Sequence, residues 1–343
     1  MRDDYVHGYG EREGRRLQDQ AQTLADLLHG GLAFPPGARI VEPGCGVGAQ
    51  TLELARRHPR AHFVSVDVSA ASLAEAERAA RRAGLTNVEF RQADVFALPF
   101  PLASFDAAFV CFLLEHLADP LRALRAVARV VKPGGALVVV EGDHGSTLLH
   151  PESAFARRAI QAQVDLQAAA GGDADIGRRL YPLLVEAGLS DVRVEPRQVY
   201  VDGSKPAWAD GFTLKTYTAM IAGVRERALA AGLIDAETFD RGVADLARSA
   251  KPDGVFAYTF FRGAARVRRQ GGGVDKDAGA RYMKRIVGGL RLCRRPAPRA
   301  SASAAPRSAK RGCGRCRSGF PTRGGPASPR NAGARLVWRR RPI

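Results

Sequence analysis

The sequence predicts an α/β protein with a doubly wound, mostly parallel sheet, and three observations lead to this fold class. Between residues 35 and 142, short β-branched runs alternate with stretches in which apolar residues recur at helical spacing. A glycine-rich turn follows the first of these runs, as at the start of a strand–helix crossover. The chain has 343 residues and 45% hydrophobic content, which is enough to fill a sizeable core.

The first strand and the turn after it are the point around which the chain is organised. Residues 39–41 are a short β-branched run, which predicts a buried strand that ends at Glu42. Three glycines follow at alternate positions: Gly44, Gly46 and Gly48. Glycines there permit a sharp turn and let a ligand lie against backbone N–H groups at a helix N-terminus. Taken alone, this pattern also fits a dinucleotide fingerprint or a tight turn without a ligand.

Two later strands end in acidic residues at positions that fit a nucleoside. Residues 62–67 form a second strand ending in Asp67, about 20 residues past the glycines, where a carboxylate accepts both hydroxyls of a ribose. Residues 88–94 form a third strand ending in Ala93 and Asp94, and an acid there suits the exocyclic amine of an adenine. Either acid would alternatively cap the helix that follows it.

The other elements follow from apolar spacing, capping residues and breakers. An amphipathic helix carrying Leu17, Leu24, Leu27 and Leu28 precedes a break at residues 35–37. Further strands are expected at residues 105–110, 136–141, 191–195, 198–201 and 255–262. Further helices are expected at residues 70–83, 121–131, 151–170, 176–187, 207–231 and 236–249, with Ser69 and Asp119 at the first two starts.

This ordered set resembles the class I S-adenosylmethionine-dependent methyltransferases over roughly residues 1–265. The motifs that carry the resemblance are Glu42-x-Gly-x-Gly-x-Gly, Asp67, Ala93-Asp94 and Lys132-Pro-Gly-Gly. Residues 98–100 and 114–117 look like the branch that methylates quinone precursors and other metabolites. The resemblance implies a Rossmann-like sheet of seven strands with an antiparallel last strand. It also implies S-adenosyl-L-methionine as cofactor and in-line methyl transfer to a small-molecule acceptor.

The resemblance also implies where the cofactor binds. The glycine turn would pack against its amino-acid part, Asp67 would bind the ribose, and Asp94 with the Val95 N–H would bind the adenine. Residues just past the fourth strand would contact its methionine end. The expected cofactor residues are Glu42, Gly44, Cys45, Gly46, Gly48, Asp67, Val68, Ala93, Asp94, Val95, Cys111 and Phe112.

Candidate catalytic residues follow the fourth and fifth strands. A base is needed only where the methyl acceptor must lose a proton. His144 is the first candidate, with Glu115 and His116 behind it, since both groups fall at the carboxyl edge of the sheet, where ligands bind. A packed or hydrogen-bonded histidine is the structural alternative. Expected substrate contacts are Tyr5, His7, Tyr9, Arg12 and Asp143.

Charge is concentrated at one end of the chain. Residues 271–343 contain 19 Lys and Arg but only Asp275 and Asp277 as acids, so this segment accounts for the whole net charge of +17. Its Gly, Ala, Pro, Ser and Arg composition predicts disorder, because it cannot bury enough apolar surface. Its arginines would suit nucleic-acid phosphates, and a solvated tail without a function is the simpler interpretation.

The cysteines favour a reduced, cytoplasmic environment. The chain has five, an odd number at uneven spacing, which does not suggest a disulfide framework. Cys313 and Cys316 have half the spacing of a zinc site without a second pair, so no metal is expected. The N-terminus lacks an apolar signal-peptide region, and no stretch is long enough to span a bilayer.

The expected organisation has five parts. Residues 1–34 form an N-terminal lid segment and helix, residues 35–195 the cofactor-binding core, and residues 196–254 an insertion that covers the substrate. Residues 255–270 hold the last strand, and residues 271–343 the basic tail.

Other functions remain open from the sequence. One is a methyltransferase directed at RNA or protein through the basic tail, and another is a nicotinamide-dependent dehydrogenase, which leaves Asp94 and residues 132–135 without a role. A third is a cofactor-binding domain that has lost catalysis and works as a partner protein.

Overall fold

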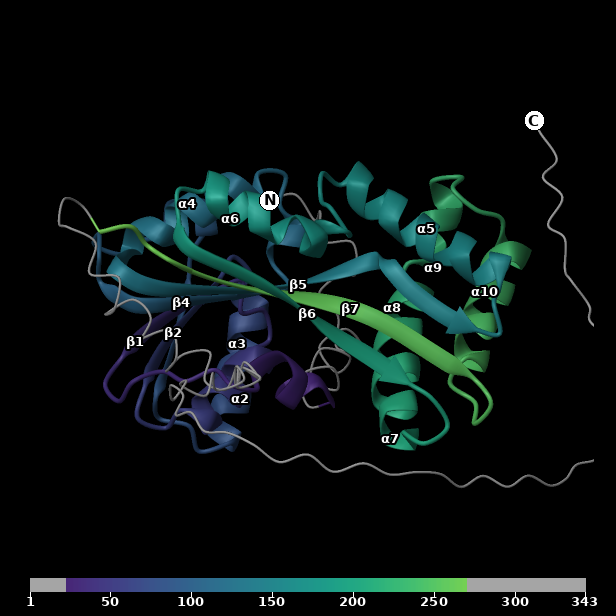
Figure 1. The fold of residues 1–343 in the computed structure, drawn as a ribbon, viewed down its shortest axis with the longest axis horizontal. Coiled ribbons are helices and arrows are strands. Elements are labelled where there is room, and N and C mark those ends of the chain that lie inside the picture. Colours follow the sequence, from purple (N-terminus) through teal and green to yellow (C-terminus); the bar gives the residue numbers. More distant parts are fainter. Residues whose placement is uncertain (1–22, 270–343) are drawn as a thin grey trace, which may run out of the picture. The chain divides into compact units, whose positions relative to one another are not determined.

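Residues 23–269 are described by a computed structural model, in which the central feature is one seven-stranded sheet (Figure 1). Its strand order is β3-β2-β1-β4-β5-β7-β6. β7 runs antiparallel to both of its neighbours, and the other six strands share one direction, as expected. The strands are β1 (Arg39–Pro43), β2 (His62–Asp67), β3 (Val88–Gln92), β4 (Phe105–Cys111), β5 (Val131–His150), β6 (Ser190–Val201) and β7 (Val255–Arg266).

Helices cover both faces of the sheet, with α2 and α3 on one face and α4 and α6 on the other (Figure 1). The α-helices are α2 (Ala49–Arg57), α3 (Ala70–Arg82), α4 (Pro120–Val130), α5 (Ala154–Ala169), α6 (Leu180–Glu186), α7 (Pro206–Trp208), α8 (Ala219–Gly223), α9 (Arg225–Ala230) and α10 (Ala236–Arg248). Short 3₁₀ turns are η1 (Val95–Ala97), η2 (Leu114–His116) and η3 (Ile176–Arg179), and η4 (Ala209–Thr218) is a π-helix. Residues 23–29 are also helical.

The predicted capping residues begin their helices. The Ser69 hydroxyl accepts a hydrogen bond from the Ser72 N–H at the start of α3. The Asp119 carboxylate accepts one from the Arg122 N–H at the start of α4, with Pro120 in the first turn. Both predicted helix starts are therefore confirmed.

Alternate residues of the central strands feed two separate cores. On β5, Val138 and Val140 join the cluster that contains Leu24 and Leu28 of the first helix. Val139, between these two residues, joins the cluster on the opposite face of the sheet. This alternation is the expected consequence of a strand buried on both faces.

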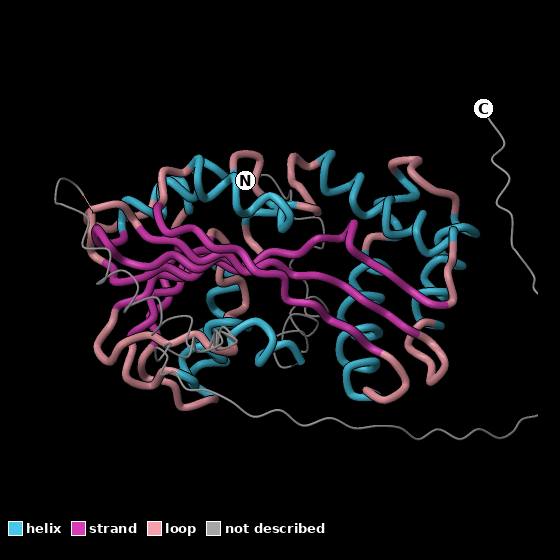
Figure 2. The backbone as a smooth tube through the Cα atoms, in the orientation of Figure 1, coloured by secondary structure: helices cyan, strands magenta, loops and turns pink. Residues whose placement is uncertain are grey.

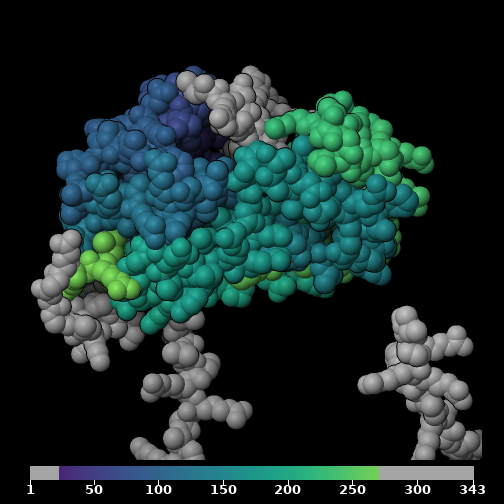
Figure 3. Space-filling model, turned by 90° about the horizontal axis from the view of Figure 1, so that it is seen from above, coloured from purple at the N-terminus to yellow at the C-terminus, as the bar shows by residue number. Residues whose placement is uncertain are grey.

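The strands β5, β6 and β7 extend past the other four and carry a second group of helices (Figure 2). β5 continues to His150, paired with Val255 of β7, whereas the sequence predicted an end at residue 141. Helices α5 and α8 to α10 lie beside this extension (Figure 1). In the space-filling view, teal surface joins the blue surface of the sheet half to the green surface of these helices (Figure 3).

Two predictions in this region were wrong in detail. β6 is one strand from Ser190 to Val201, although the sequence predicted two strands interrupted at Pro196. β6 is the edge strand of the sheet, where a proline's missing N–H costs little, so the strand continues through it. The insertion between β6 and β7 consequently starts at residue 202 instead of residue 196.

The single helix predicted at residues 207–231 is four elements, α7, η4, α8 and α9. Its π-helical part contains Gly211, where an added Cβ would lie 2.4 Å from the Thr23 hydroxyl oxygen of the first helix. The Thr216 hydroxyl donates to the Gly211 carbonyl oxygen at 2.8 Å. Close packing against the first helix thus accompanies the wider helical turn, and spacing alone does not reveal such a contact.

Candidate functional site at the carboxyl edge of the sheet

The glycine turn between β1 and α2 has three residues in the left-handed region, with φ of +74° at Gly44, +52° at Gly46 and +78° at Gly48. A Cβ at Gly44 would lie 2.7 Å from a Leu113 methyl carbon, and one at Gly48 would lie 2.9 Å from the Ala76 Cβ. A Cβ at Gly46 would meet nothing within 4 Å. The turn is therefore tightly packed at its two ends and open at its centre, where a ligand can approach the backbone.

Asp67, at the end of β2, holds this turn in place. One carboxylate oxygen accepts a hydrogen bond from the Gly46 N–H at 2.8 Å, and the other accepts one from the Ser69 N–H at 2.9 Å. Ser69 is the residue that caps α3, so Asp67 does not have the capping role left open by the sequence. Each carboxylate oxygen can accept a further hydrogen bond.

Asp94, after β3, does cap the turn that follows it. Its carboxylate accepts a hydrogen bond from the Phe96 N–H at 2.8 Å at the start of η1. Asp94 is exposed and Val95 is buried. After β2, the Val68 side chain is 47% exposed.

Glu42 is buried beneath the glycine turn. Its Oε2 atom accepts hydrogen bonds from the Thr51 hydroxyl at 2.5 Å and the Ser65 hydroxyl at 2.7 Å. Burial outweighs these bonds and raises the pKa of Glu42 to about 7. The free protein near neutral pH consequently holds this carboxyl in both protonation states.

The end of β4 carries local backbone strain and a second buried acid. Phe112 has φ of +54°, rare for a residue with a side chain, and Cys111 before it is buried. Glu141 of β5 accepts hydrogen bonds from the N–H groups of Leu113 and Leu114 through Oε1, at 3.1 and 2.8 Å. Burial and the charge of Glu115 raise the pKa of Glu141 well above its usual value.

Glu141 is the residue for which sequence reasoning assigned no separate role. Its side chain is fully buried, and its Oε2 atom has no partner among residues 23–269. The available signal was an acid at the end of a predicted buried strand, three residues before the candidate base. The two thiols nearby, Cys45 and Cys111, are buried, and burial raises the pKa of each well above its usual value.

His144 is held in one orientation on the extended part of β5. Its backbone N–H donates to the Ala174 carbonyl oxygen at 3.1 Å, and its Nδ1 lies 3.0 Å from the same oxygen. A carbonyl oxygen only accepts, so Nδ1 carries the proton and the neutral ring has its lone pair on Nε2. Nε2 is buried and has no partner within residues 23–269.

Asp143 and Gly142, just before His144, make further contacts that hold this part of β5 in place. Both oxygens of the Asp143 carboxylate are bonded by the guanidinium of Arg178 on η3, at 2.9 and 2.5 Å. A Cβ at Gly142 would lie 2.2 Å from the Tyr258 hydroxyl oxygen and one at Gly177 would lie 2.6 Å from the Gly142 carbonyl oxygen. The Asp143 carboxylate is thus already bonded to Arg178, and the substrate contact expected for it remains a prediction.

Glu115 and His116 lie on η2, after β4. The Glu115 Oε1 atom is 3.7 Å from His116 Nε2, and its Oε2 atom accepts a bond from Gln167 of α5 at 3.3 Å. Glu115 is buried and His116 is partly buried. The other expected substrate residues, Tyr5, His7, Tyr9 and Arg12, lie outside the described residues, as do Cys313 and Cys316.

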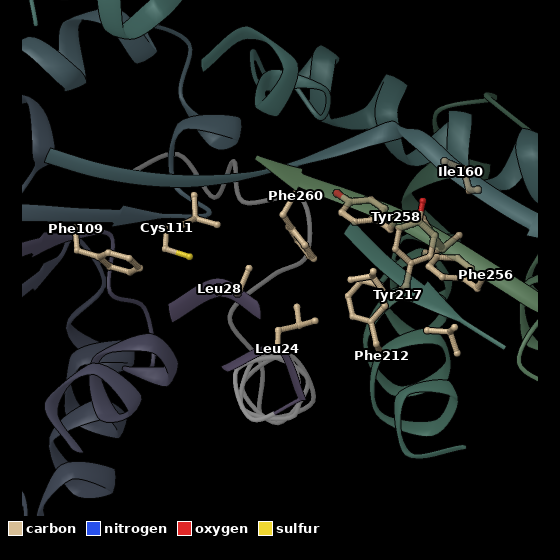
Figure 4. Close-up of a cluster of buried hydrophobic side chains, with 14 of the residues drawn as sticks. Leu24, Leu28, Phe109, Cys111, Ile160, Phe212, Tyr217, Phe256, Tyr258 and Phe260 are labelled. Atoms are coloured by element: carbon tan, nitrogen blue, oxygen red, sulfur yellow. The ribbon is translucent and has the colours of Figure 1, made fainter. Parts of the chain in front are cut away.

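A cluster of packed aromatic rings lies next to His144. Figure 4 shows Phe212, Tyr217, Phe256 and Tyr258 together, with Phe260, Leu24 and Leu28 between them and Cys111 of β4. We call Phe112, Phe212, Tyr217, Phe256, Tyr258 and Phe260 the aromatic cluster. The His144 ring centroid is 5.9 Å from that of Tyr217 and 5.7 Å from that of Tyr258. Phe112 and Phe260 lie 5.4 Å apart, which joins the cluster to the end of β4.

Within residues 23–269, no three or more His, Cys, Asp or Glu side chains are arranged to hold a metal ion. Over the same residues, no helix combines the length and apolar character needed to cross a membrane.

Comparisons with known proteins show which family the chain resembles. Residues 41–139 match a family model described as a methyltransferase domain. A 27-O-demethylrifamycin SV methyltransferase of Amycolatopsis mediterranei (strain S699) is 30% identical over 236 residues, covering 65% of this chain and 76% of the relative. A demethylmenaquinone methyltransferase of Clavibacter sepedonicus is 32% identical over 218 residues, covering 63% and 77%.

Among solved structures, a phosphoethanolamine N-methyltransferase of Haemonchus contortus, in complex with phosphomonomethylethanolamine and S-adenosylhomocysteine, is similar with a TM-score of 0.48. It is 19% identical, and the alignment covers 72% of this chain and 53% of that chain.

Proposed function

Since the chain belongs to the class I S-adenosylmethionine-dependent methyltransferases that act on small molecules, we propose that its acceptor atom is a hydroxyl oxygen and that His144 is the general base. The observation that carries this proposal is the unpaired Nε2 lone pair of His144, buried beside the aromatic cluster. An oxygen nucleophile with a proton to lose is the acceptor that such a base serves.

The described residues fit the cofactor by charge. S-adenosylmethionine supplies an activated methyl group on a positively charged sulfonium, and it also carries an ammonium group. Glu42 and Glu141 are buried acids with raised pKa values and without a basic partner among residues 23–269. A cation placed near them compensates their ionised forms.

We propose that the cofactor lies along the ends of β1, β2, β3 and β4. Asp67 has free acceptor capacity for ribose hydroxyls, and the exposed Val68 side chain offers an apolar surface for the adenine. Gly46 leaves room for the amino-acid part. The proposed set is the one expected from the sequence: Glu42, Gly44, Cys45, Gly46, Gly48, Asp67, Val68, Ala93, Asp94, Val95, Cys111 and Phe112.

On the acceptor side, we propose three roles for residues of this chain. The aromatic cluster excludes water and binds an apolar acceptor. His144 takes the hydroxyl proton at Nε2, while Nδ1–H stays bonded to the Ala174 carbonyl oxygen and keeps the ring oriented. Glu115 and His116 are the alternative acid–base pair, behind His144 because the Glu115 carboxylate is already bonded by Gln167.

The two relatives act, by name, on an O-demethylated rifamycin and on demethylmenaquinone, both small organic molecules. These names support an acceptor of this size and class for the present chain. The alternative in which a basic tail directs the enzyme to RNA concerns residues 271–343, which lie outside the described residues.

An acceptor screen tests the proposal. The full chain is incubated with S-adenosylmethionine labelled in the methyl group and with matched aromatic acceptors that carry a hydroxyl, an amine or only ring carbons. We expect label in an O-methyl product. Transfer only to amines or carbons contradicts the proposed acceptor atom.

A further inference from the structure

Gln163, in the middle of α5, is a fully buried amide with one unpaired atom. Its Nε2 donates to the Gln167 Oε1 atom at 2.8 Å. Its own Oε1 atom has no partner among residues 23–269. A buried amide oxygen without a hydrogen bond is costly, so a partner is expected from a ligand or a bound water.

The hydrogen-bond chain fixes which amide atom is unpaired. Gln167 Nε2 lies 2.9 Å from the backbone carbonyl oxygen of Glu115, an atom that only accepts. The Gln167 oxygen therefore faces Gln163, and only the Gln163 nitrogen can bond to it. The free atom of Gln163 is an acceptor, so its missing partner is a hydrogen-bond donor.

Gln163 sits on the side of α5 that faces the site. One turn earlier, Ile160 packs in the same hydrophobic core as Tyr217 and Tyr258 (Figure 4). One turn later, Gln167 donates to Glu115 on η2, the turn that follows β4.

Glu115, at one end of the hydrogen-bond chain from Gln163, and His144 both influence Tyr258. Burial and then the charge of Glu115 raise the pKa of the Tyr258 hydroxyl, which lies 3.3 Å from His144 Nδ1. The Glu115 carboxylate therefore raises the pKa of the same tyrosine that His144 contacts. Gln163 is linked to that carboxylate through Gln167.

Two buried acceptor atoms near the aromatic cluster thus have no hydrogen-bond donor among residues 23–269. They are Nε2 of His144 and Oε1 of Gln163. We propose that Gln163 is a specificity-determining residue and that the methyl acceptor is an aromatic compound with two hydroxyl groups. The first hydroxyl donates to His144 and is methylated. The second donates to Gln163 and orients the ring. This inference rests on the proposed role of His144.

The test compares equilibrium binding of 2-naphthol with that of dihydroxynaphthalenes carrying the second hydroxyl on the other ring. The full chain is saturated with S-adenosylhomocysteine, so no methyl is transferred. We expect at least one diol to bind the wild type about tenfold more tightly than 2-naphthol, because the second hydroxyl satisfies a buried acceptor. Equal affinities, or no binding of any of these probes, overturn the proposal.

Variants locate the effect. In Gln163→Leu, and in Gln163→Met, which keeps the length of the side chain, the diol should bind no more tightly than 2-naphthol. Gln161→Leu is the matched control, because Gln161 is exposed on the same helix and its amide donates to the Asp165 carboxylate. It should keep the wild-type preference. A preference retained in both Gln163 variants overturns the assignment.

If both Gln163 variants fail to fold, the wild-type comparison decides. The outcome is also separate from that of the proposed function, since a preference for diols is an equilibrium property. A diol preference without O-methylation would leave Gln163 as a recognition residue and refute His144 as the base.

Discussion

Nδ1 of His144 and the carbonyl oxygen of Ala174 lie 3.0 Å apart, and the backbone N–H of His144 donates to the same oxygen. One backbone carbonyl thereby fixes both the position and the tautomer of the ring. Ala174 precedes η3, whose Arg178 grips the carboxylate of Asp143. The orientation of His144 consequently depends on the contact between β5 and η3.

The first prediction concerns Arg178→Met. Removing the guanidinium leaves the Asp143 carboxylate, 4% exposed, without its partner. We expect a loss of about 1–2 kcal/mol in the free energy of unfolding, less than for a fully buried pair because Arg178 is half-exposed. Arg179→Met is the control, since its pair with Asp173 is more exposed, and denaturant unfolding should show a smaller loss. Equal losses would contradict a special role for the Arg178 contact.

The second prediction concerns pH and Glu42. The folded protein keeps the Glu42 proton up to pH about 7, whereas the unfolded chain loses it near its ordinary pKa of 4.5. This contribution to stability is complete below pH 4.5 and is lost as the pH rises to about 7, amounting to about 3 kcal/mol. Glu42→Gln should lack this decline in urea unfolding between pH 5 and 8. Identical pH dependence in both proteins would show that Glu42 is not the cause.

The third prediction concerns the proposed ribose contact. Asp67→Ala should weaken S-adenosylmethionine binding by about tenfold or more, because two ribose hydroxyls lose their acceptor. Asp119→Ala is the matched control, because its carboxylate caps α4 and should affect stability by about 1 kcal/mol without changing affinity. Calorimetric titration measures both. Unchanged affinity in a folded Asp67→Ala protein would remove Asp67 from the site.

The fourth prediction concerns the basic segment at residues 271–343. Its composition offers no apolar periodicity from which to build a core, so deleting it should leave the melting temperature and cofactor affinity nearly unchanged. Thermal unfolding of the shortened chain, with and without cofactor, is the measurement. A drop of many degrees would contradict the composition-based interpretation.

The succession of strands and helices along the chain and the glycine turn could be predicted because they depend on local signals. The continuous apolar run of β5 and the caps at Ser69 and Asp119 are determined by neighbouring residues. The cofactor site was predicted from the spacing of motifs along the chain. Because β1, β2 and β3 are parallel neighbours, the motifs that follow them lie at the same edge of the sheet.

The acceptor side could not be predicted in the same way, since its contacts join distant segments. Gln163 and Gln167 look like ordinary polar positions of an amphipathic helix, whereas both are buried in the fold, where Gln167 donates to the Glu115 carbonyl oxygen on η2. The length of β5 beyond residue 141 depends on pairing with β7, more than 100 residues away in sequence. The hydrogen bond from His144 to Ala174 is likewise a tertiary contact.

The central claim is that His144 removes the acceptor proton, and the single-turnover methyl-transfer rate of His144→Gln tests it most directly. The glutamine amide can still donate to the Ala174 carbonyl oxygen, but it offers no basic lone pair. With saturating cofactor and a hydroxyl acceptor, we predict a rate about 10²–10⁴ times lower than that of the wild type, with unchanged cofactor affinity. A variant rate within about threefold of the wild-type rate would contradict the claim.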